Sequence, residues 1–340
     1  MPPIEHRPVD RRRFLRSTTA AAAAALPLST ARASANERIG VAFLGCGGRA
    51  QAHMHLAKKF AGEGLGVVPV AVCDVWDGIE EEYDQHHNGT TTRRKFSQGL
   101  YPAAGTLGLD ARDRTRVTKD YRRVLDRKDV DVVVIATPDH WHAKMVLDAI
   151  AAGKDVLVES PLARTPEEAV AVRDAAAASN RVVSVCCPTL ADPSWSVARE
   201  QLRTLGPAVH LSASVFRSDP RGLWRFYRVV PEMTARSIDW DLFLGHRFEV
   251  NGVPLGPTPT VRPFDRTVFA QWRCYAPFSG GPFTDLFTAP ITRLLAAAGL
   301  GFPTRVSASG GLFHERDGRT VPDVGTISAE FPGGCHLTLT

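Results

Sequence analysis

A glycine-rich segment, Gly45-Cys46-Gly47-Gly48-Arg49-Ala50, separates a strand-like apolar run from a stretch of helical composition. Gly45 permits a tight turn, Gly47 leaves the backbone room to approach a pyrophosphate, and the small Ala50 lets the helix pack on the strand. The N–H groups at the start of a helix also bind anions. The pattern therefore predicts that this segment binds a dinucleotide, with an ordinary glycine turn as the alternative.

An acidic residue follows the next apolar run. Asp74 comes directly after Val67–Cys73 and lies 24 positions beyond Ala50. This is roughly the separation at which a carboxylate binds the adenosine ribose 2′-hydroxyl. A 2′-phosphate would meet the same negative charge, so the sequence predicts NAD as the cofactor, with NADP less favoured.

These residues need a parallel sheet to bring them together. Between residues 36 and 188, apolar runs alternate with helical patterns, and the predicted strands are Ile39–Leu44, Val67–Cys73, Val130–Thr137, Asp155–Glu159 and Val182–Cys186. Nearly continuous apolar strands separated by helices are typical of a parallel sheet covered on both faces. The sequence thus predicts an α/β, Rossmann-type NAD-binding domain over residues 36–188. We expect the polar stretch 84–119 to be an excursion at the rim of its site.

The pattern changes over residues 189–340. Helices are predicted over about 193–204 and up to Ala298, and alternating runs over Val209–Phe216, Thr304–Phe313, Gly325–Phe331 and His336–Thr340. Strands with one solvated face predict an α+β domain with a largely antiparallel open sheet, serving substrate binding and oligomerisation. The chain stops inside the last run, so we expect a truncated domain whose final strand lies at an edge or lacks its partner.

The first 35 residues do not belong to the predicted fold. Arg11-Arg12-Arg13-Phe14-Leu15-Arg16 precedes an alanine-rich stretch and small-residue cleavage sites at residues 31–35. This arrangement resembles a twin-arginine export signal and predicts a periplasmic or extracytoplasmic location. A disordered basic tail is the alternative. A stable membrane anchor is not expected, because the apolar stretch is short and Pro27 interrupts it.

Charge and cysteine content exclude other classes of protein. The net charge is +5, but residues 1–35 account for +4 of it, so the remaining chain has no basic surface for nucleic acid. The six cysteines form no Cys-x-x-Cys pair. We therefore expect small buried side chains rather than a metal site or a disulfide framework.

Several motifs occur in order between the two predicted domains. They include Thr137-Pro138-Asp139-His140-Trp141-His142 after a strand, Glu159-Ser160-Pro161-Leu162 after the next, and then Asp239-Trp240-Asp241, Trp272-Arg273 and Gly280-Gly281 with Asp285. In this order they closely resemble the Gfo/Idh/MocA oxidoreductases, the family of glucose-fructose oxidoreductase and inositol dehydrogenase, and in particular its exported branch. The similarity spans residues 38–340.

The resemblance implies roles for individual residues. It places Thr137, Pro138 and His142 along the nicotinamide half of the cofactor, and Glu159 beside the nicotinamide. It places Trp272 and Arg273 at the border of the substrate cleft.

Three positions depart from the family pattern. Ser160 stands where the family has a lysine whose ammonium contacts the substrate hydroxyl that loses its proton during hydride transfer. Ala289 and Thr292 replace a histidine and an aspartate that follow Asp285 in the family. A serine hydroxyl ionises far above pH 7 and needs a neighbouring base. The chain is therefore predicted to bind NAD but to lack the usual proton acceptor.

Other side chains could take over the proton. Besides Ser160, the candidates are His140, His142, Tyr275 and Asp285, because histidines and perturbed carboxylates act as general bases. Structural roles are the alternatives: the histidines could cap loops or face solvent, Tyr275 could pack at the domain junction, and Asp285 could cap the following helix. No metal is expected at the two histidines, since a third ligand is missing.

Three interpretations of function remain open. The first is an NAD-linked oxidoreductase acting on a sugar, polyol or related hydroxyl compound with a substitute base. The second is a catalytically degenerate relative that binds nucleotide and sugar without turnover. The third is an NAD-dependent glycosidase resembling the exported α-N-acetylgalactosaminidases, although no Thr-His-Gly-type signature occurs near residues 282–290.

The expected partner is a small molecule. Aromatic and arginine side chains over residues 224–228 and 272–275 suit a sugar-like ligand, although they would also suit a protein interface. By resemblance, a homo-oligomer is also expected.

Overall fold

The computed structural model describes residues 38–87, 90–217, 219–225, 227–245, 249–250, 253–254 and 261–340. The predicted twin-arginine signal, residues 1–35, lies outside the described residues. Residues 38–340 form one compact unit.

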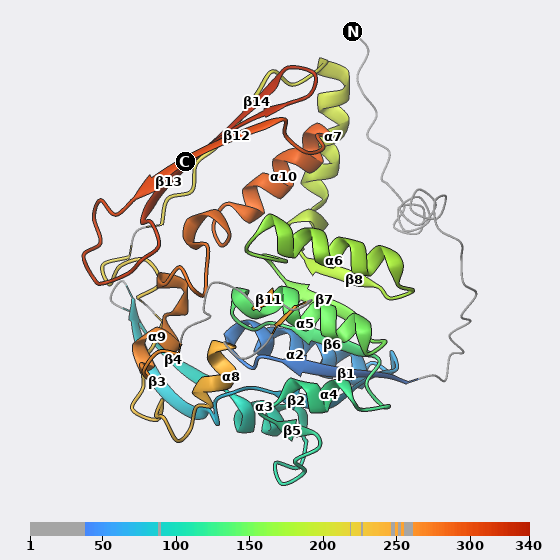
Figure 1. Ribbon diagram of the computed structural model, residues 1–340, viewed down its shortest axis with the longest axis vertical. Coiled ribbons are helices and arrows are strands. Elements are labelled where there is room, and N and C mark those ends of the chain that lie inside the picture. The colour runs from blue at the N-terminus through green and yellow to red at the C-terminus, as the bar shows by residue number, and fades with distance from the viewer. Residues whose placement is uncertain are drawn as a thin grey trace. The chain divides into compact units, whose positions relative to one another are not determined.

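A parallel sheet organises the first half of this unit (Figure 1). Its six strands lie in the order β5-β2-β1-β6-β7-β8, and their bounds are β1 Ile39–Leu44, β2 Val67–Cys73, β5 Val117–Thr118, β6 Val132–Ile135, β7 Asp155–Glu159 and β8 Val183–Cys186. All five strand pairs are parallel. The predicted Rossmann-type sheet is thereby confirmed, with the short β5 as an additional edge strand.

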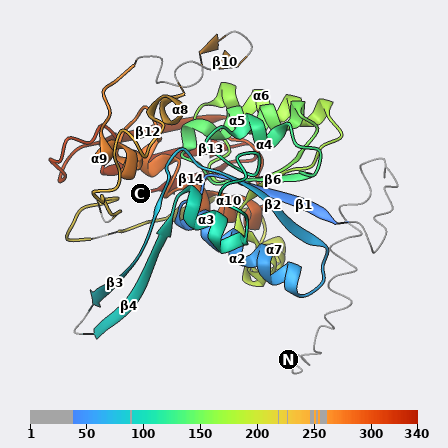
Figure 2. The same cartoon turned by 90° about the horizontal axis from the view of Figure 1, so that it is seen from below.

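Helices cover both faces of this sheet because successive strand side chains point to opposite sides. Phe43 and Val72 pack beneath α2 (Gly48–Gly62) and α3 (Leu100–Leu107). Leu44 and Ala71 pack beneath helices of the other face, namely α4 (Tyr121–Leu125), α5 (Asp139–Ala151) and α6 (Pro166–Ala178). Figure 2 shows the two helical layers on either side of the strands.

Helix α6 begins with a capping box. Thr165 Oγ1 accepts a hydrogen bond from the Glu168 N–H at 3.2 Å, and Pro166 is the first helical residue. The Glu168 carboxylate reaches back to the Arg164 N–H at 2.9 Å. The capping box thus satisfies two N–H groups at the start of the helix.

The stretch predicted as an excursion is largely regular. It contains most of an antiparallel hairpin, β3 (Ile79–His87) and β4 (Thr90–Gln98), followed by α3 and β5. The hairpin projects away from the parallel sheet in Figure 2. Its base is fixed by Arg228, whose guanidinium lies 4.6 Å from the Tyr83 ring centroid and 5.2 Å from that of Phe96. The predicted excursion is thus built largely from regular elements, and its residues Phe96, Gln98 and Lys119 line the cleft described below.

A second sheet lies in the C-terminal part, with the order β12-β13-β14-β9 (Figure 1). Its strands are β9 His210–Ala213, β12 Arg305–Gly311, β13 Val324–Phe331 and β14 Cys335–Leu339. Strands β12, β13 and β14 are antiparallel, whereas β14 and β9 are parallel. The expected edge position of the final strand is wrong. Strand β14 pairs with β13 on one side and with β9, from earlier in the chain, on the other.

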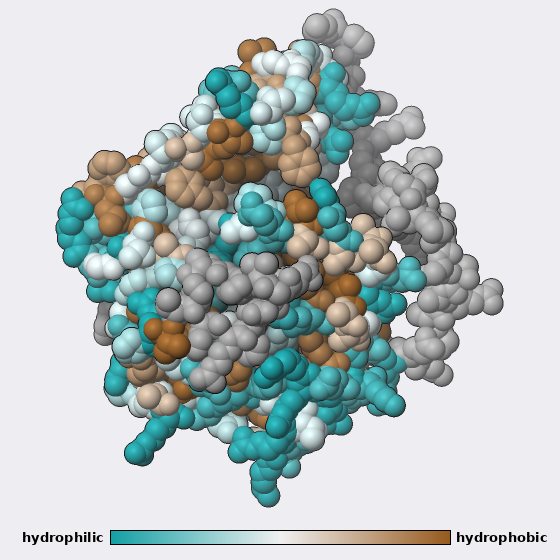
Figure 3. All heavy atoms as spheres, viewed as in Figure 1, coloured by the Kyte–Doolittle hydropathy of each residue, from teal (hydrophilic) through white to brown (hydrophobic). Residues whose placement is uncertain are grey.

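Helix α10 (Thr288–Ala298) packs on one face of this sheet and contacts α7 (Pro193–Leu205). Leu337, Leu339 and Phe331 point toward the helix from alternate strand positions. On the face shown in Figure 3, hydrophobic residues gather over α10, whereas the surface around β5 is largely hydrophilic. None of the helices in the described ranges is long and apolar enough to cross a membrane.

Short elements connect the two sheets. They are the 3-10 helices η1 Pro188–Ala191, η2 Trp272–Cys274 and η3 Gly281–Phe283, the helices α8 Trp240–Leu244 and α9 Arg266–Ala270, and the strands β10 Glu249–Val250 and β11 Val253–Pro254. Backbone bonds from Asp239 to Val75 and from Asp77 to Ser237 join this region to the segment after β2. These bonds place C-terminal residues over the carboxyl ends of the parallel strands.

Candidate functional site

A cleft of about 520 Å³ lies at the carboxyl ends of β1, β2 and β6. Strands β2 and β5 lie on one side of β1, and β6, β7 and β8 lie on its other side. The cleft therefore lies where the strand order reverses. One wall comes from the Rossmann part, through Gly45, Asp74 and Thr137; the opposite wall includes Tyr227 and Trp272. Open α/β sheets bind ligands at this position.

The glycine-rich turn occupies the floor of the cleft. Gly45 has φ +82°, and a Cβ there would lie 2.7 Å from the Ala136 carbonyl oxygen, so only glycine fits between β1 and β6. Gly47 precedes α2, and a Cβ there would meet nothing within 4 Å. Ala50 is fully buried against the sheet. Gly48 and Arg49 also line the cleft, so this part of the predicted segment is brought together.

Asp74 connects the turn to the second strand. Its carboxylate accepts hydrogen bonds from the Cys46 N–H at 2.6 Å and the Trp76 N–H at 2.8 Å. Burial raises the pKa of Asp74, while these N–H groups and Lys119 act in the opposite direction. A carboxylate offers about four acceptor sites, so two N–H donors leave capacity for ribose hydroxyls.

The cleft also contains polar atoms that lack partners. Thr137 Oγ1 and Trp76 Nε1 are buried, line the cleft and find no hydrogen-bond partner in the described part of the chain. Buried polar groups are normally hydrogen-bonded, so both atoms suit a polar ligand. Together with the open space at Gly47 and the acceptor at Asp74, they fit a dinucleotide. Pro138, which precedes α5, lines the same wall.

The opposite wall presents aromatic rings and a guanidinium. The Arg273 guanidinium lies 4.1 Å from the Trp272 ring centroid and 5.0 Å from that of Tyr227. Arg273 Nε is 3.9 Å from a carboxylate oxygen of Asp285, whose other oxygen accepts a hydrogen bond from Trp224 Nε1 at 2.7 Å. The two residues predicted to border the substrate thus lie in one wall of the cleft.

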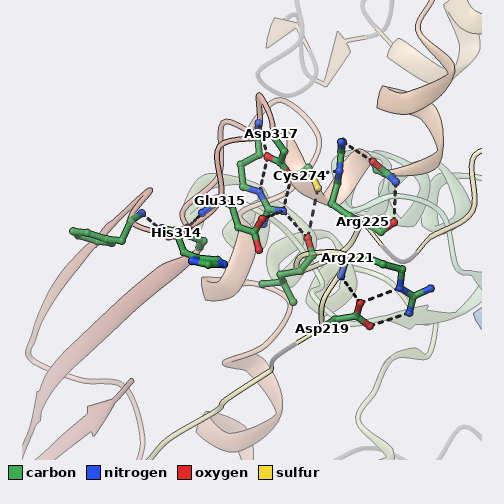
Figure 4. Close-up of polar contacts among 12 residues, drawn as sticks. Asp219, Arg221, Arg225, Cys274, His314, Glu315 and Asp317 are labelled. Atoms are coloured by element: carbon green, nitrogen blue, oxygen red, sulfur yellow. Dashed lines mark hydrogen bonds and ion pairs between the residues drawn. The ribbon is translucent and has the colours of Figure 1, made fainter. Parts of the chain in front are cut away.

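A buried ionic cluster holds this wall in place (Figure 4). Arg225 and Asp317 point toward one another, with 3.4 Å between Nε and the carboxylate. The fully buried Arg319 side chain donates to Asp317 at 2.7 Å and to the Leu223 carbonyl at 2.8 Å. Gln271 donates to the carbonyls of residues 225 and 227 at 3.1 Å. These bonds fix the segments that carry Tyr227 and Arg273.

We predict that Arg319→Met lowers the free energy of unfolding by about 3–5 kcal/mol. The largely buried Asp317 would lose its closest partner and keep only the longer contact to Arg225, and the Leu223 carbonyl would lose its donor. Urea unfolding at neutral pH measures this change. Arg221→Met is the matched control, since Arg221 also pairs with an aspartate but its side chain is 62% exposed. If both variants unfold like the parent protein, the cluster does not stabilise the wall.

None of the five predicted catalytic side chains is among the cleft-lining residues. Ser160 follows β7, and Asp285 lies behind Arg273. Asp285 does not cap α10, whose N-cap is Phe287. Tyr275 packs in the junction between hydrophobic clusters, and burial raises the pKa of its phenol. The geometry therefore does not support these side chains as groups that contact substrate directly.

His140 lies in a buried joint between the two parts of the molecule. Its Nε2 is 2.7 Å from the Phe243 carbonyl oxygen, which also accepts a hydrogen bond from Trp141 Nε1 at 3.0 Å. The ring packs between Phe243 and Phe278. Burial lowers the pKa of His140 to about 3, against the effect of the bond to Phe243. This position corrects the interpretation of His140 as a proton acceptor, because the ring does not reach the cleft.

The low pKa of His140 predicts acid sensitivity. The unfolded ring takes up a proton near pH 6.5 but the folded ring only near pH 3, so stability present above pH 6.5 is lost as the pH falls. Across that window the loss amounts to about 3–5 kcal/mol. We expect His140→Gln, which keeps a donor for the Phe243 carbonyl, to flatten this dependence in urea unfolding measured from pH 7 to pH 3.5. An unchanged pH profile would contradict the assignment.

His142 joins the two loops that follow β6 and β7. Its Nδ1 is 2.6 Å from the Pro161 carbonyl oxygen and its Nε2 is 2.9 Å from the Thr137 carbonyl oxygen. With both nitrogens engaged and the residue 1% exposed, His142 positions the loop that carries Thr137. The loop-capping alternative describes it better than a proton acceptor does.

Glu159 lies at the end of β7 but is not among the cleft-lining residues. Its carboxylate oxygen is 2.7 Å from Arg49 Nε and 2.5 Å from His53 Nε2. Burial raises the pKa of Glu159, but these hydrogen bonds outweigh burial and lower it to about 2. Glu159 therefore reaches the cleft only through Arg49.

Sequence reasoning missed several residues of the site. Trp76, Phe96 and Lys119 line the cleft, although none belongs to a motif. Lys119 donates to the Ser237 carbonyl at 2.8 Å and pairs with Asp77 at 2.9 Å. Tyr227 also lines the cleft, and it lies in the stretch 224–228 whose aromatic and arginine content predicted a sugar-like ligand.

A parallel sheet with a glycine-rich turn at its switch point, joined to a second α+β part, defines a two-part dinucleotide-binding protein. Residues 39–186 match the GFO_IDH_MocA family, described as "Oxidoreductase family, NAD-binding Rossmann fold". Residues 39–186 are therefore similar to the NAD-binding Rossmann domain of the Gfo/Idh/MocA oxidoreductases. The match confirms the resemblance over these residues.

Curated relatives include a dehydrogenase and a glycosidase. A levoglucosan dehydrogenase of Pseudarthrobacter phenanthrenivorans is 33% identical over 120 residues, 33% of this chain and 31% of the relative. An alpha-N-acetylgalactosaminidase of Shewanella oneidensis is 32% identical over 140 residues, 41% of this chain and 26% of the relative. The match thus spans a third or less of each relative's length.

Solved structures share the fold. The WlbA dehydrogenase of Bordetella pertussis, solved with NADH and UDP-GlcNAcA, has a TM-score of 0.61 at 16% identity, covering 89% of this chain and 71% of that one. A levoglucosan dehydrogenase in complex with NADH has a TM-score of 0.58 at 20% identity, covering 89% and 66%. At this identity the likeness concerns the fold alone.

Proposed function

We propose that the protein is an NAD-linked oxidoreductase that acts on a hydroxyl group of a sugar, polyol or related compound. One observation carries this proposal: the dinucleotide turn and the wall of Tyr227, Trp272 and Arg273 face each other across a single cleft. Aromatic faces pack on sugar rings, and guanidinium groups bind hydroxyls or carboxylates. The levoglucosan dehydrogenase among the relatives supports a sugar-like substrate.

We propose Tyr227 as the group that exchanges the substrate proton, because it lines the cleft on the wall that also carries Trp272 and Arg273. Among the other ionisable residues that line the described cleft, Asp74 is bound to backbone N–H groups at the far end of the dinucleotide site. The hydroxyl of Tyr121 donates to Asp148, and Lys119 is held by Asp77 and Ser237. Tyr227 lies in the substrate wall, with Arg273 beside its ring.

The proposed division of labour follows from these positions. Bound NAD supplies the hydride acceptor. The turn at Gly45 and Gly47 holds the phosphates, and Asp74 orients the ribose through its remaining acceptor sites. Trp272 and Arg273 orient the substrate, while the Tyr227 hydroxyl relays the proton of the reacting hydroxyl: its oxygen accepts that proton as its own proton passes to solvent. Ser160 is the departure that makes this substitute necessary.

A second candidate is an NAD-dependent glycosidase. The similarity to the alpha-N-acetylgalactosaminidase and to several "Glycosyl hydrolase family 109" proteins supports it. These matches cover only 24–37% of the relatives' lengths. The wall residues fit both reactions and do not separate the two candidates. We place the glycosidase second because the glycosidase signature is missing near residues 282–290.

One set of assays separates the candidates. Denatured protein should release NAD(H) in nearly stoichiometric amount, and release of no nucleotide would contradict every candidate. Reduction of bound NAD⁺ by members of a sugar and polyol panel supports the dehydrogenase. Release of p-nitrophenol from aryl glycosides supports the glycosidase. No turnover, combined with sugar-dependent thermal stabilisation, indicates the catalytically degenerate relative.

We further propose that the protein is exported by the twin-arginine route to the periplasm or another extracytoplasmic location. The motif at residues 11–16 supports this location. Cell fractionation of the parent and of an Arg12→Lys/Arg13→Lys variant tests it. Export of both at the same level would contradict the proposal.

A homo-oligomer is proposed as well. Most of β12 is exposed and forms one edge of the second sheet, which leaves that edge open to pairing. Size-exclusion chromatography with light scattering tests it, and a monomer at all concentrations would exclude it.

A further inference from the structure

Three metal-binding atoms of different kinds converge beside the cleft. His53 comes from α2, Glu159 from the end of β7, and Cys186 from the end of β8. A ring nitrogen, a carboxylate oxygen and the sulfur of these residues all lie within 4.8 Å of one another. The side chains of His53 and Glu159 are 13% and 14% exposed, so the group is largely buried but still accessible to solvent. Glu159 lies 106 positions after His53, and Cys186 lies 27 positions after Glu159. No short sequence motif could therefore predict that they converge.

The ligand types select one kind of ion. Mg²⁺ and Ca²⁺ prefer oxygen ligands, whereas Zn²⁺ binds imidazole nitrogen, carboxylate oxygen and thiolate sulfur together. Three protein ligands are the number found in zinc sites that keep one position open for water or another ligand. The set therefore matches zinc better than Mg²⁺ or Ca²⁺.

A positive charge already occupies the centre of this group. Arg49 Nε lies 2.7 Å from the Glu159 carboxylate, and Arg49 Nη2 lies 3.6 Å from Cys186 Sγ. The guanidinium thus takes the place between carboxylate and sulfur that a metal cation would take. Because the Arg49 side chain is 48% exposed, it can leave the group without burying its charge.

We propose that His53, Glu159 and Cys186 bind one Zn²⁺ ion, with Arg49 as the competing cation. On binding, the Cys186 thiol gives its proton to solvent and ligates as thiolate. Glu159 then exchanges its bond to Arg49 for a bond to the metal. Since Arg49 also lines the cleft, metal binding would change the charge at the edge of the dinucleotide site.

Cobalt titration of the chelator-treated protein under reducing conditions tests the proposal, because Co²⁺ reports thiolate ligation by near-ultraviolet charge-transfer absorption. We expect one Co²⁺ per chain with this absorption and its loss on adding stoichiometric Zn²⁺. Cys186→Ser should abolish the absorption, and His53→Gln should weaken Co²⁺ binding by about tenfold or more. Arg49→Gln should strengthen it several-fold, because the competing cation is gone.

Cys187→Ser is the matched control, since Cys187 is adjacent in sequence but outside the converging group. It should retain the absorption. Circular dichroism of each metal-free variant checks folding, and the opposite responses of His53→Gln and Arg49→Gln stand even if Cys186→Ser misfolds. The proposal is overturned if neither the parent nor Arg49→Gln shows thiolate-to-cobalt absorption, or if the absorption depends on Cys187 instead. This test is independent of the proposed dehydrogenase activity.

Discussion

Tyr227→Phe is expected to lower kcat by about 10²–10⁴ while the protein still binds NAD(H), since positioned acid–base catalysis contributes a factor of this size. The substitution removes only the hydroxyl oxygen and keeps the ring on which Arg273 lies. Cofactor binding depends on the opposite wall and should not change. Stopped-flow reduction of bound NAD⁺, with the best substrate from the panel, measures the effect.

Tyr275→Phe provides the control for this prediction. Tyr275 lies in the same segment as Arg273 but is not among the cleft-lining residues. We expect its kcat to stay close to the parent value. If Tyr275→Phe is impaired and Tyr227→Phe is not, the assignment of the proton-exchanging group is incorrect. A gain of activity on combining Tyr227→Phe with Ser160→Lys would show that a lysine at position 160 can still serve the reaction.

Gly45→Ala and Gly47→Ala are expected to fail in different ways. At Gly45 a Cβ would lie 2.7 Å from the Ala136 carbonyl and the backbone has φ +82°, so alanine should cost about 3 kcal/mol of folding free energy. At Gly47 a Cβ meets nothing within 4 Å, so folding should change by less than about 1 kcal/mol. The same Cβ would stand where the pyrophosphate approaches, and NADH should bind about tenfold more weakly or worse.

Urea unfolding and calorimetric titration with NADH separate the two effects. The decisive comparison is Gly47→Ala, because its folded state should be intact. Unchanged NADH affinity in that variant would mean that the phosphates lie elsewhere. An unaltered unfolding curve for Gly45→Ala would mean that β1 and β6 can separate to admit a side chain.

The structure also explains why the histidines of the family-like motif are poor catalytic candidates here. His140 is bound to the Phe243 carbonyl, and His142 spans the carbonyls of Thr137 and Pro161. Both rings join loops or domains around the cleft. Asp139 between them is buried as well, where burial raises its pKa and Ser279 donates to it at 3.1 Å. In this structure the side chains of the motif therefore connect the segments around the cleft, and neither histidine is among the cleft-lining residues.

The sequence by itself determined the parts that depend on local pattern. Nearly continuous apolar runs predicted five of the six parallel strands to within a few residues, because strands covered by helices on both faces are apolar along their length. The two-residue β5 gave no such signal. The start of α6 and the glycine turn are also encoded locally in the sequence, since backbone geometry and short-range hydrogen bonds determine both structures. Asp74 belongs to this group, because its distance from the turn follows from one helix and one strand.

Only the tertiary structure decided which side chains meet across the cleft. Tyr227 reaches the site because Gln271 and the Arg319 cluster hold its segment, and these partners are more than 40 residues away in sequence. His53, Glu159 and Cys186 converge for the same reason. The final strand lies inside its sheet because β9, more than 120 residues earlier, pairs beside it. Such encounters depend on how whole elements pack, and local periodicity carries no information about them.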